Sequence, residues 1–385
     1  MLKILIACDK YKSSLSSNQV CSIIAAAIKD LDESVSVELN PMADGGEGTL
    51  ETLVESFGGR YIKAVVRNPL GEDTEARFGM LKDNTAVIEM AAASGLWMIP
   101  FEKRNPMETT TYGTGQLIKK AIENNAKKII LGIGGSATND GGMGMAQALG
   151  IRFYDGDGNL LGFGGKQLLK IKKIDMSGLH KGATDVLFEC ACDVENPLTG
   201  KNGAAYVYAA QKGADSKMIR ELNRGLINFA GVVKEDLGKN IRDLKGAGAS
   251  GGLGGGMVAF LNAKLRIGVN IVMDVTKLEK KMKGADLVIT GEGAFDRQTF
   301  FGKSAFGVAS LAKKLNIPVI TINGSVLSDR KNMSRENSEL FAGNFSIVSR
   351  PMDLNDAIEN ADELLYNATK ELINFYLKSK KTKNN

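Results

Sequence analysis

Loops that carry polar side chains, four of them also rich in glycine, follow predicted strands at five places in this sequence. The loops are residues 41–48, 132–142, 192–198, 246–256 and 290–303. A loop of this kind between a strand and a helix points backbone N–H groups at an anion. Carboxylates that can hold Mg²⁺ and lysines that can neutralise phosphate oxygens accompany these loops, so together they predict phosphoryl transfer.

The segments that position these loops alternate between strand and helix at both ends of the chain. Near the start, the apolar run Lys3–Cys8 has the length of a strand, and apolar residues at helical spacing follow it, with Ser16 or Ser17 as N-cap. Near the end, residues 285–290 and 317–322 read as strands around a helix at 303–315, and a long helix closes the chain. This rhythm predicts a parallel sheet with crossover helices.

The middle of the chain has a different pattern, with short strands at 76–81 and 85–91 and little room for helices between them. We therefore predict an α/β protein of two unequal domains. A Rossmann- or flavodoxin-like parallel-sheet domain is formed by residues 1–64 and 285–385, and a glycine-rich α/β domain with a mixed sheet, residues 65–284, is inserted into it.

Composition limits the classes of function. The 385 residues include one histidine, His180, which excludes any metal site with two histidine ligands and argues against a Ser-His-Asp hydrolase. Of the net charge of +5, four positive charges lie in the last eight residues, which leaves 5 − 4 = +1 for the body and argues against a nucleic-acid binder. We expect that basic tail to be a solvated, disordered end.

The expected location is the cytoplasm. The four cysteines lie in or beside apolar segments, as reduced thiols in a cytosolic core do. No run reaches the roughly 18 uncharged apolar residues of a membrane span, so we predict no membrane association.

A rival interpretation rests on a relaxed dinucleotide-binding fingerprint. Gly132, Gly134 and Ala137 fit its loop, and Asp155 follows at the required distance, which would indicate an NAD-dependent dehydrogenase. The polar cluster at residues 136–140 suits a nucleotide or metal-phosphate site better than an NAD loop. A sugar-acid binding protein is a second alternative, but it leaves the many lysines and carboxylates at strand ends unexplained.

In combination, these motifs strongly resemble the bacterial two-domain α/β glycerate kinases, the glycerate 2-kinase family. The resemblance is carried by residues 9–15 (DKYKSSL, where the family has DSFKGSL), by residues 41–49 (PMADGGEGT), and by the loops at 132–142, 193–198, 246–254 and 290–303. It implies transfer of the γ-phosphoryl group of ATP to D-glycerate with Mg²⁺, in a cleft between two α/β domains. The 2-hydroxyl is the expected acceptor and the 3-hydroxyl stays open, as does a homo-oligomeric assembly.

Roles for individual residues are hypotheses from their chemistry. Asp193 and Asp296 are candidates to accept the hydroxyl proton or to hold Mg²⁺, and Lys12 is a third catalytic candidate. The residues predicted to bind glycerate or phosphates are Asp9, Lys10, Asp44, Glu47, Arg297, Gln298 and Lys303. Those predicted to bind the nucleotide are Gly134, Gly135, Ser136, Asn139, Gly251 and Gly252.

Overall fold

The computed structural model describes residues 1–300, 303–327 and 339–383. The chain divides into two compact units, a terminal unit made of Met1–Asp44 and Val269–Asn385 and an inserted unit, Gly45–Gly268. The predicted α/β fold, in which both chain ends form one parallel sheet around an inserted mixed-sheet domain, is confirmed.

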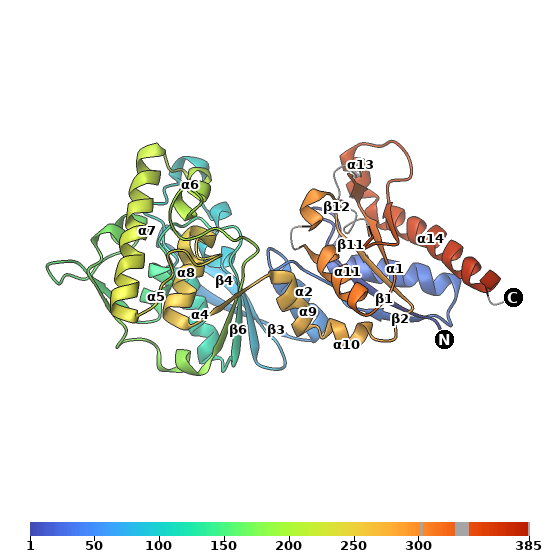
Figure 1. Cartoon of the computed structure of the whole chain (residues 1–385), viewed down its shortest axis with the longest axis horizontal. Helices are drawn as coiled ribbons and strands as arrows, with labels where there is room; N and C mark the ends of the chain where they lie inside the picture. Colours follow the sequence, from blue (N-terminus) through green and yellow to red (C-terminus); the bar gives the residue numbers. More distant parts are fainter. Residues whose placement is uncertain (301–302, 328–338, 384–385) are drawn as a thin grey trace. The chain divides into compact units, whose positions relative to one another are not determined.

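A parallel sheet that includes β1, β2 and β11 forms the centre of the terminal unit (Figure 1). Its described strands lie in the order β15-β13-β11-β1-β2. The strands are β1 (Lys3–Cys8), β2 (Ser36–Leu39), β11 (Leu287–Gly291), β13 (Val319–Asn323) and β15 (Gly343–Ser346). Counted along the chain, this is the flavodoxin-like order 2-1-3-4-5. Such sheets bind ligands where the strand order reverses, which here is beyond the carboxyl ends of β1 and β11.

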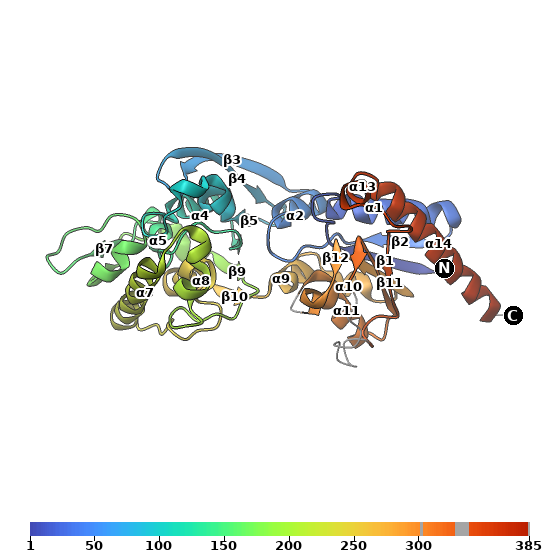
Figure 2. The same ribbon diagram turned by 90° about the horizontal axis from the view of Figure 1, so that it is seen from above.

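Helices cover both faces of this sheet. One face packs Ile4, Ile6 and Ile289 against α1 (Ser17–Leu31) and α14 (Ala361–Lys383), while α11 (Ser304–Lys314) contacts the opposite face (Figure 2). Shorter elements complete the unit: α9 (Gly268–Val275), α10 (Leu278–Met282), β12 (Ala294–Phe295), the 3₁₀ turn η6 (Arg297–Phe300), β14 (Ser325–Val326) and α13 (Leu354–Glu359). Ser16 is the N-cap of α1 and accepts a hydrogen bond from the Gln19 N–H, as one of the two predicted caps.

The inserted unit is built on a mixed sheet whose described strands lie in the order β10-β9-β6-β5-β4-β3. Its strands are β3 (Arg60–Arg67), β4 (Asp73–Met80), β5 (Thr85–Glu89), β6 (Lys128–Gly132), β9 (Leu187–Ala191) and β10 (Lys264–Arg266). The first three pair antiparallel, and β5, β6, β9 and β10 run parallel. The loops that follow the parallel strands therefore gather at one edge.

Helices and a small second sheet surround the mixed sheet of the inserted unit. The helices are α2 (Thr49–Phe57), α3 (Ala91–Ser94), α4 (Tyr112–Glu123), α5 (Met143–Ala148), α6 (Ala204–Tyr208), α7 (Ser216–Leu237) and α8 (Ala249–Leu261). Strands β7 (Arg152–Tyr154) and β8 (Lys173–Asp175) pair only with each other among the described strands. The 3₁₀ turns are η1 (Leu96–Met98), η2 (Phe101–Lys103), η3 (Gly165–Lys170), η4 (Lys181–Asp185) and η5 (Ala210–Lys212).

Both unit boundaries lie earlier in the chain than the sequence-predicted ones, which were 64/65 and 284/285. Helix α2 and most of strand β3 precede residue 65, yet they contact β4 of the inserted unit. Helix α10 precedes residue 285 but belongs to the terminal unit. An apolar pattern identifies these elements without showing which sheet they pack on.

Two local expectations are wrong. Seven glycines within residues 246–256 argue against an ordinary helix there, but Gly254, Gly255 and Gly256 lie in α8. Glycine occupies these helical positions because of close packing: a Cβ on Gly254 or Gly256 would lie 2.4 or 2.3 Å from the carbonyl oxygen of Gly246 or Gly141. The basic tail is not a disordered end either, since α14 extends to Lys383 and the Lys380 ammonium pairs with Asp286 at 3.2 Å.

Candidate active site

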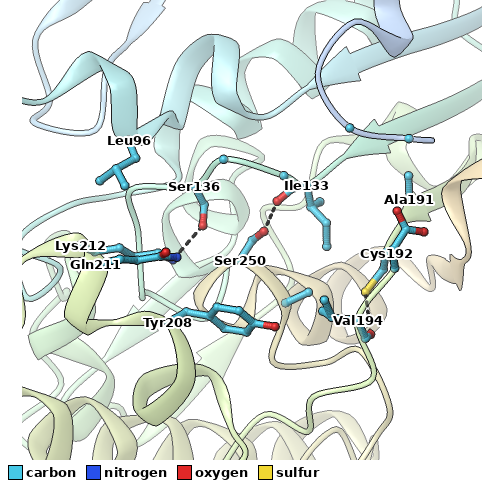
Figure 3. Close-up of a pocket in the computed structure, with 16 residues that line it drawn as sticks. Leu96, Ile133, Ser136, Ala191, Cys192, Val194, Tyr208, Gln211, Lys212 and Ser250 are labelled. Carbon is cyan, nitrogen blue, oxygen red and sulfur yellow. Dashed lines mark hydrogen bonds between the residues drawn. The ribbon is translucent and has the colours of Figure 1, made fainter. Parts of the chain in front are cut away.

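A cavity of about 450 Å³ lies at the carboxyl edge of the parallel strands in the inserted unit (Figure 3). Its wall includes Gly134, Gly135 and Ser136 after β6, Asp193 after β9, and Ser250 at the start of α8. Gly45 and Gly46 of the loop 41–48 line it as well, so four of the five loops predicted from the sequence meet at one cavity.

The loop after β6 is fixed by a buried carboxylate. Asp140 accepts hydrogen bonds from the N–H and the hydroxyl of Thr111, at 2.8 and 2.9 Å, and from the N–H groups of Gly142 and Gly144, at 3.1 and 3.2 Å. Burial still raises the pKa of Asp140. The carboxylate that sequence reasoning assigned to a polar ligand-binding cluster therefore holds the loop in shape.

The glycine-rich segment 246–256 packs tightly against the loop after β6. Ser250, Gly251 and Gly252 all have left-handed backbone, with φ of 53°, 68° and 93°, directly before the regular part of α8. A Cβ on Gly251 would lie 2.0 Å from the carbonyl oxygen of Thr138, and the carbonyl of Gly251 accepts a hydrogen bond from the Gly141 N–H at 3.0 Å. The Ser250 hydroxyl donates to the carbonyl oxygen of Ile133. This turn brings Ser250 to the cavity and buries the two glycines.

A lysine that sequence analysis did not single out forms part of the cavity wall. Lys212 is 1 % exposed, and its ammonium donates to the Ser136 hydroxyl at 2.7 Å and to the Thr138 carbonyl at 2.6 Å. Burial lowers the pKa of Lys212 to about 7, although the charge of Asp140 opposes this. Figure 3 shows Lys212 and Ser136 pointing toward each other at the cavity.

Residues after β9 line the cavity as well. Asp193 accepts a hydrogen bond from the Gly268 N–H at 2.8 Å, which orients its carboxylate. The Cys192 thiol donates to the Val194 carbonyl, and burial raises its pKa, so it is a protonated wall residue rather than a nucleophile. Tyr208 adds an aromatic ring, and its hydroxyl donates to the Asn196 side chain at 2.7 Å.

The terminal unit has a site rich in carboxyl groups beyond the carboxyl ends of β1 and β11, opposite in charge to Lys212 of the inserted unit. Asp9 accepts hydrogen bonds from the Ser304 hydroxyl at 2.6 Å and from the Lys10 N–H at 2.7 Å. Burial, followed by the charges of Asp44 and Glu292, raises the pKa of Asp9 to about 7 despite these bonds. The carboxyl groups of Asp9, Asp44 and Glu292 therefore form a cluster at the point where the strand order of the sheet reverses.

Glu292 connects this acidic cluster to the first turn of α11. It accepts a hydrogen bond from the Thr299 hydroxyl at 2.6 Å and forms an ion pair with the Lys303 ammonium at 3.6 Å. Burial raises the pKa of Glu292 as well. Carboxylates that accept hydrogen bonds from hydroxyl groups, beside an ammonium that attracts an anion, suit a small hydroxy acid.

The predicted site residues divide between the two units. The terminal unit contains Asp9, Lys10, Lys12, Asp44, Asp296, Arg297 and Lys303, and the side chain of Gln298 lies outside the described residues. The inserted unit contains Glu47, Gly134, Gly135, Ser136, Asn139, Asp193, Gly251 and Gly252. Of these, Gly134, Gly135, Ser136 and Asp193 line the cavity, whereas Asn139, Gly251 and Gly252 are buried.

The cavity suits a nucleotide phosphate chain better than a bare metal ion. Gly134 and Gly135 are exposed at its wall, and Gly135 has φ of 71°, so backbone groups can approach a ligand closely. In the part of the chain that the structure describes, no group of three or more His, Cys, Asp or Glu residues could hold a metal ion. Mg²⁺ bound together with nucleotide needs only one or two carboxylates, and Asp193 provides one.

Lys212, Ser304 and Glu292 are the site residues that sequence reasoning missed as individuals. Lys212 interrupts a segment from 204 to 214 that is otherwise rich in alanine and contains no other charged residue. A lone lysine in such a segment was the available signal. Ser304 gave no comparable signal, because its bond to Asp9 joins residues that are 295 positions apart.

The dehydrogenase interpretation fails on the position of Asp155. This residue follows β7, which lies in the small antiparallel sheet rather than beside β6. Its carboxylate accepts hydrogen bonds from the N–H groups of Asp157 and Asn159 within its own turn, at 3.0 and 2.9 Å. The acidic residue that would have to bind the ribose of NAD therefore lies away from β6 and accepts hydrogen bonds within its own turn.

In the described part of the chain, no helix combines the length and apolar character needed to cross a membrane.

Comparisons with known proteins agree over nearly the whole chain. Residues 4–377 match the model of the "Glycerate kinase family". The chain is 45% identical to a glycerate kinase of Halalkalibacterium halodurans, over 97% of both chains, and 44% identical to glycerate 2-kinase of Escherichia coli, over 96% of this chain and 97% of that one. The crystal structure of a candidate glycerate kinase 2 from Salmonella typhimurium LT2 superposes with a TM-score of 0.91 at 43% identity, covering 99% of each chain.

Proposed function

Since the chain belongs to the glycerate kinase family and is therefore a phosphotransferase, we propose that it phosphorylates the 2-hydroxyl of D-glycerate with ATP. The bond between the γ-phosphorus and the oxygen that leaves with ADP breaks, and a bond from the same phosphorus to the glycerate oxygen forms. The hydroxyl proton passes to a carboxylate of the protein. The full-length similarity to a glycerate 2-kinase is the observation that carries the proposal, including the choice of hydroxyl.

In this proposal, the cavity of the inserted unit receives the phosphates of ATP. The backbone at Gly134 and Gly135 and the hydroxyl of Ser136 lie at its wall and supply hydrogen-bond donors. Asp193 lies at the same wall, and Asp296 lies after β12 in the terminal unit. Either residue would hold Mg²⁺, which neutralises negative charge on the phosphates when bound.

The terminal unit would receive glycerate. Lys303, Arg297 and Lys12 carry positive charge near or along the loops after β11 and β1, and they would bind the substrate carboxylate. The acidic cluster, with Asp9 at its centre, would accept hydrogen bonds from the substrate hydroxyls. The base that takes the proton is Asp193 or Asp296, and the cleft expected between the two units stays a prediction of the sequence.

The test is an incubation of the purified protein with MgATP and D-glycerate, followed by ³¹P NMR of the product and a coupled assay for ADP. We expect ADP release that depends on D-glycerate, with the phosphorus signal of 2-phosphoglycerate. A signal of 3-phosphoglycerate would contradict the choice of hydroxyl, and ADP release that does not depend on glycerate would contradict the proposed function.

A further inference from the structure

We propose that Lys212 binds a phosphate group of the nucleotide in the cavity of the inserted unit, an inference that rests on the proposed function. This lysine lies outside the glycine-rich motifs that predicted the site. Gly134, Gly135 and Ser136 carry no charge, and the geometry assigns Lys212 the role of supplying positive charge at the cavity wall.

The first argument is the hydrogen bonding of Lys212. An ammonium group has three N–H donors, and two of them are engaged by the Ser136 hydroxyl and the Thr138 carbonyl. Both acceptors belong to the loop whose glycines line the cavity. The lysine therefore holds that loop while its remaining N–H is available to a ligand at the same wall.

The second argument is charge. The side chain is 1 % exposed, and no Asp or Glu among the described residues forms an ion pair with it. The charge of Asp140 reaches it, but that carboxylate is engaged by donors from Thr111, Gly142 and Gly144. A buried ammonium without a counter-ion is unfavourable, and burial lowers its pKa accordingly. A bound anion would supply the missing negative charge.

The third argument is the kind of anion. None of the residues that line this cavity is an arginine, which is the side chain best suited to bind a carboxylate through two parallel bonds. Lysine acts as a point charge and commonly binds phosphate, especially beside a glycine-rich loop. Gly134 and Gly135 form such a loop next to it. The site therefore fits phosphate oxygens better than the carboxylate of glycerate.

The experiment compares MgADP binding by isothermal titration calorimetry in the full-length wild type, Lys212→Met and Lys212→Arg. We expect Lys212→Met to weaken MgADP by about 10- to 100-fold and Lys212→Arg to weaken it less, because arginine keeps the charge but changes the geometry. The KM for D-glycerate should stay within about threefold in variants that turn over. The control is Lys166→Met in the same unit, which removes an exposed ion pair with Glu108 and should bind MgADP as the wild type does.

Three outcomes would overturn the inference. Lys212→Met could bind MgADP as tightly as the wild type, which would make the lysine a purely structural link. It could weaken glycerate alone, which would place the substrate carboxylate at Lys212. If Lys212→Met does not fold, wild-type crystals with MgADP decide, and an ammonium more than about 3.5 Å from every phosphate oxygen would overturn the inference. Since MgADP binding needs no turnover, a failure here is distinct from an absence of kinase activity in the wild type.

Discussion

The two units place their polar residues at the same kind of position but with opposite charge. In the terminal unit, the carboxyl ends of β1 and β11 carry the acidic cluster of Asp9, Asp44 and Glu292. In the inserted unit, the loops after β6 and β9 surround a cavity whose buried charged group is the lysine Lys212. In our proposal, the carboxyl ends of parallel strands place a ligand in each unit, and the buried charge selects which ligand it is.

Burial shifts the pKa of Asp9 and the pKa of Lys212 toward the same value from opposite directions. It raises the pKa of Asp9 to about 7 and lowers the pKa of Lys212 to about 7. A carboxyl group with a raised pKa is stabilised by a cation or a hydroxyl donor, and a lysine with a lowered pKa is stabilised by an anion. The difference supports glycerate in the terminal unit and nucleotide phosphates in the inserted unit.

The largest effect expected in either unit comes from its candidate catalytic carboxylate. Asp193→Asn in the inserted unit and Asp296→Asn in the terminal unit each keep the shape of the side chain and remove its charge. We expect the variant that loses the general base to lower kcat by about 100- to 10,000-fold in the coupled ADP assay. Asp243→Asn, at an exposed position of the inserted unit, is the control and should retain wild-type turnover. Full turnover in both Asp193→Asn and Asp296→Asn would exclude both carboxylates.

The interlocked loops of the inserted unit predict a large effect on stability. Gly251→Ala combines a left-handed backbone, φ of 68°, with a Cβ placed 2.0 Å from the Thr138 carbonyl oxygen. We expect it to lower the free energy of unfolding by about 2–4 kcal/mol, measured by thermal or urea denaturation. Gly158→Ala is the matched control, since Gly158 has φ of 80° and no atom within 4 Å of its added Cβ. Equal destabilisation by the two variants would show that backbone strain alone accounts for the effect.

The opposite charges predict opposite dependences of stability on pH. The pKa of Asp9 is raised in the folded state, so its contribution to stability is lost as pH rises from about 4 to about 7. The pKa of Lys212 is lowered, so its contribution is lost as pH falls from about 10.5 to about 7. Asp9→Asn should flatten the first slope and Lys212→Met the second, in free energies of unfolding measured across this range. If both variants flattened the same slope, the comparison between the units would be wrong.

Much of the fold could be predicted from the sequence, because periodicity records which face of an element is buried. The strand Lys3–Cys8 and the helices after it and before β13 lie within a few residues of their predicted bounds. The boundary between the units could not be predicted in the same way. Strand β3 has eight residues and an amphipathic pattern, but only its pairing with β4 shows which sheet it joins.

The glycine motifs identified loops that line the cavity, but the structure places some of their residues differently from the prediction. Ser136 lines the cavity as predicted, whereas Asn139, three residues later, is fully buried because Asp140 turns the loop inward. Lys212 was missed because its position depends on η5 packing beneath that loop, 76 residues away from Ser136. Spacing along a sequence predicts contacts within one loop, but it does not predict those that join distant loops.

A crystal structure of the full-length protein with MgADP would test the comparison most directly. The account predicts a phosphate oxygen within about 3.2 Å of the Lys212 ammonium, in the cavity lined by Gly134, Gly135 and Ser136. The contrary result would be phosphates at the first turn of α11 in the terminal unit, beside Lys303, with the cavity at Lys212 holding no nucleotide.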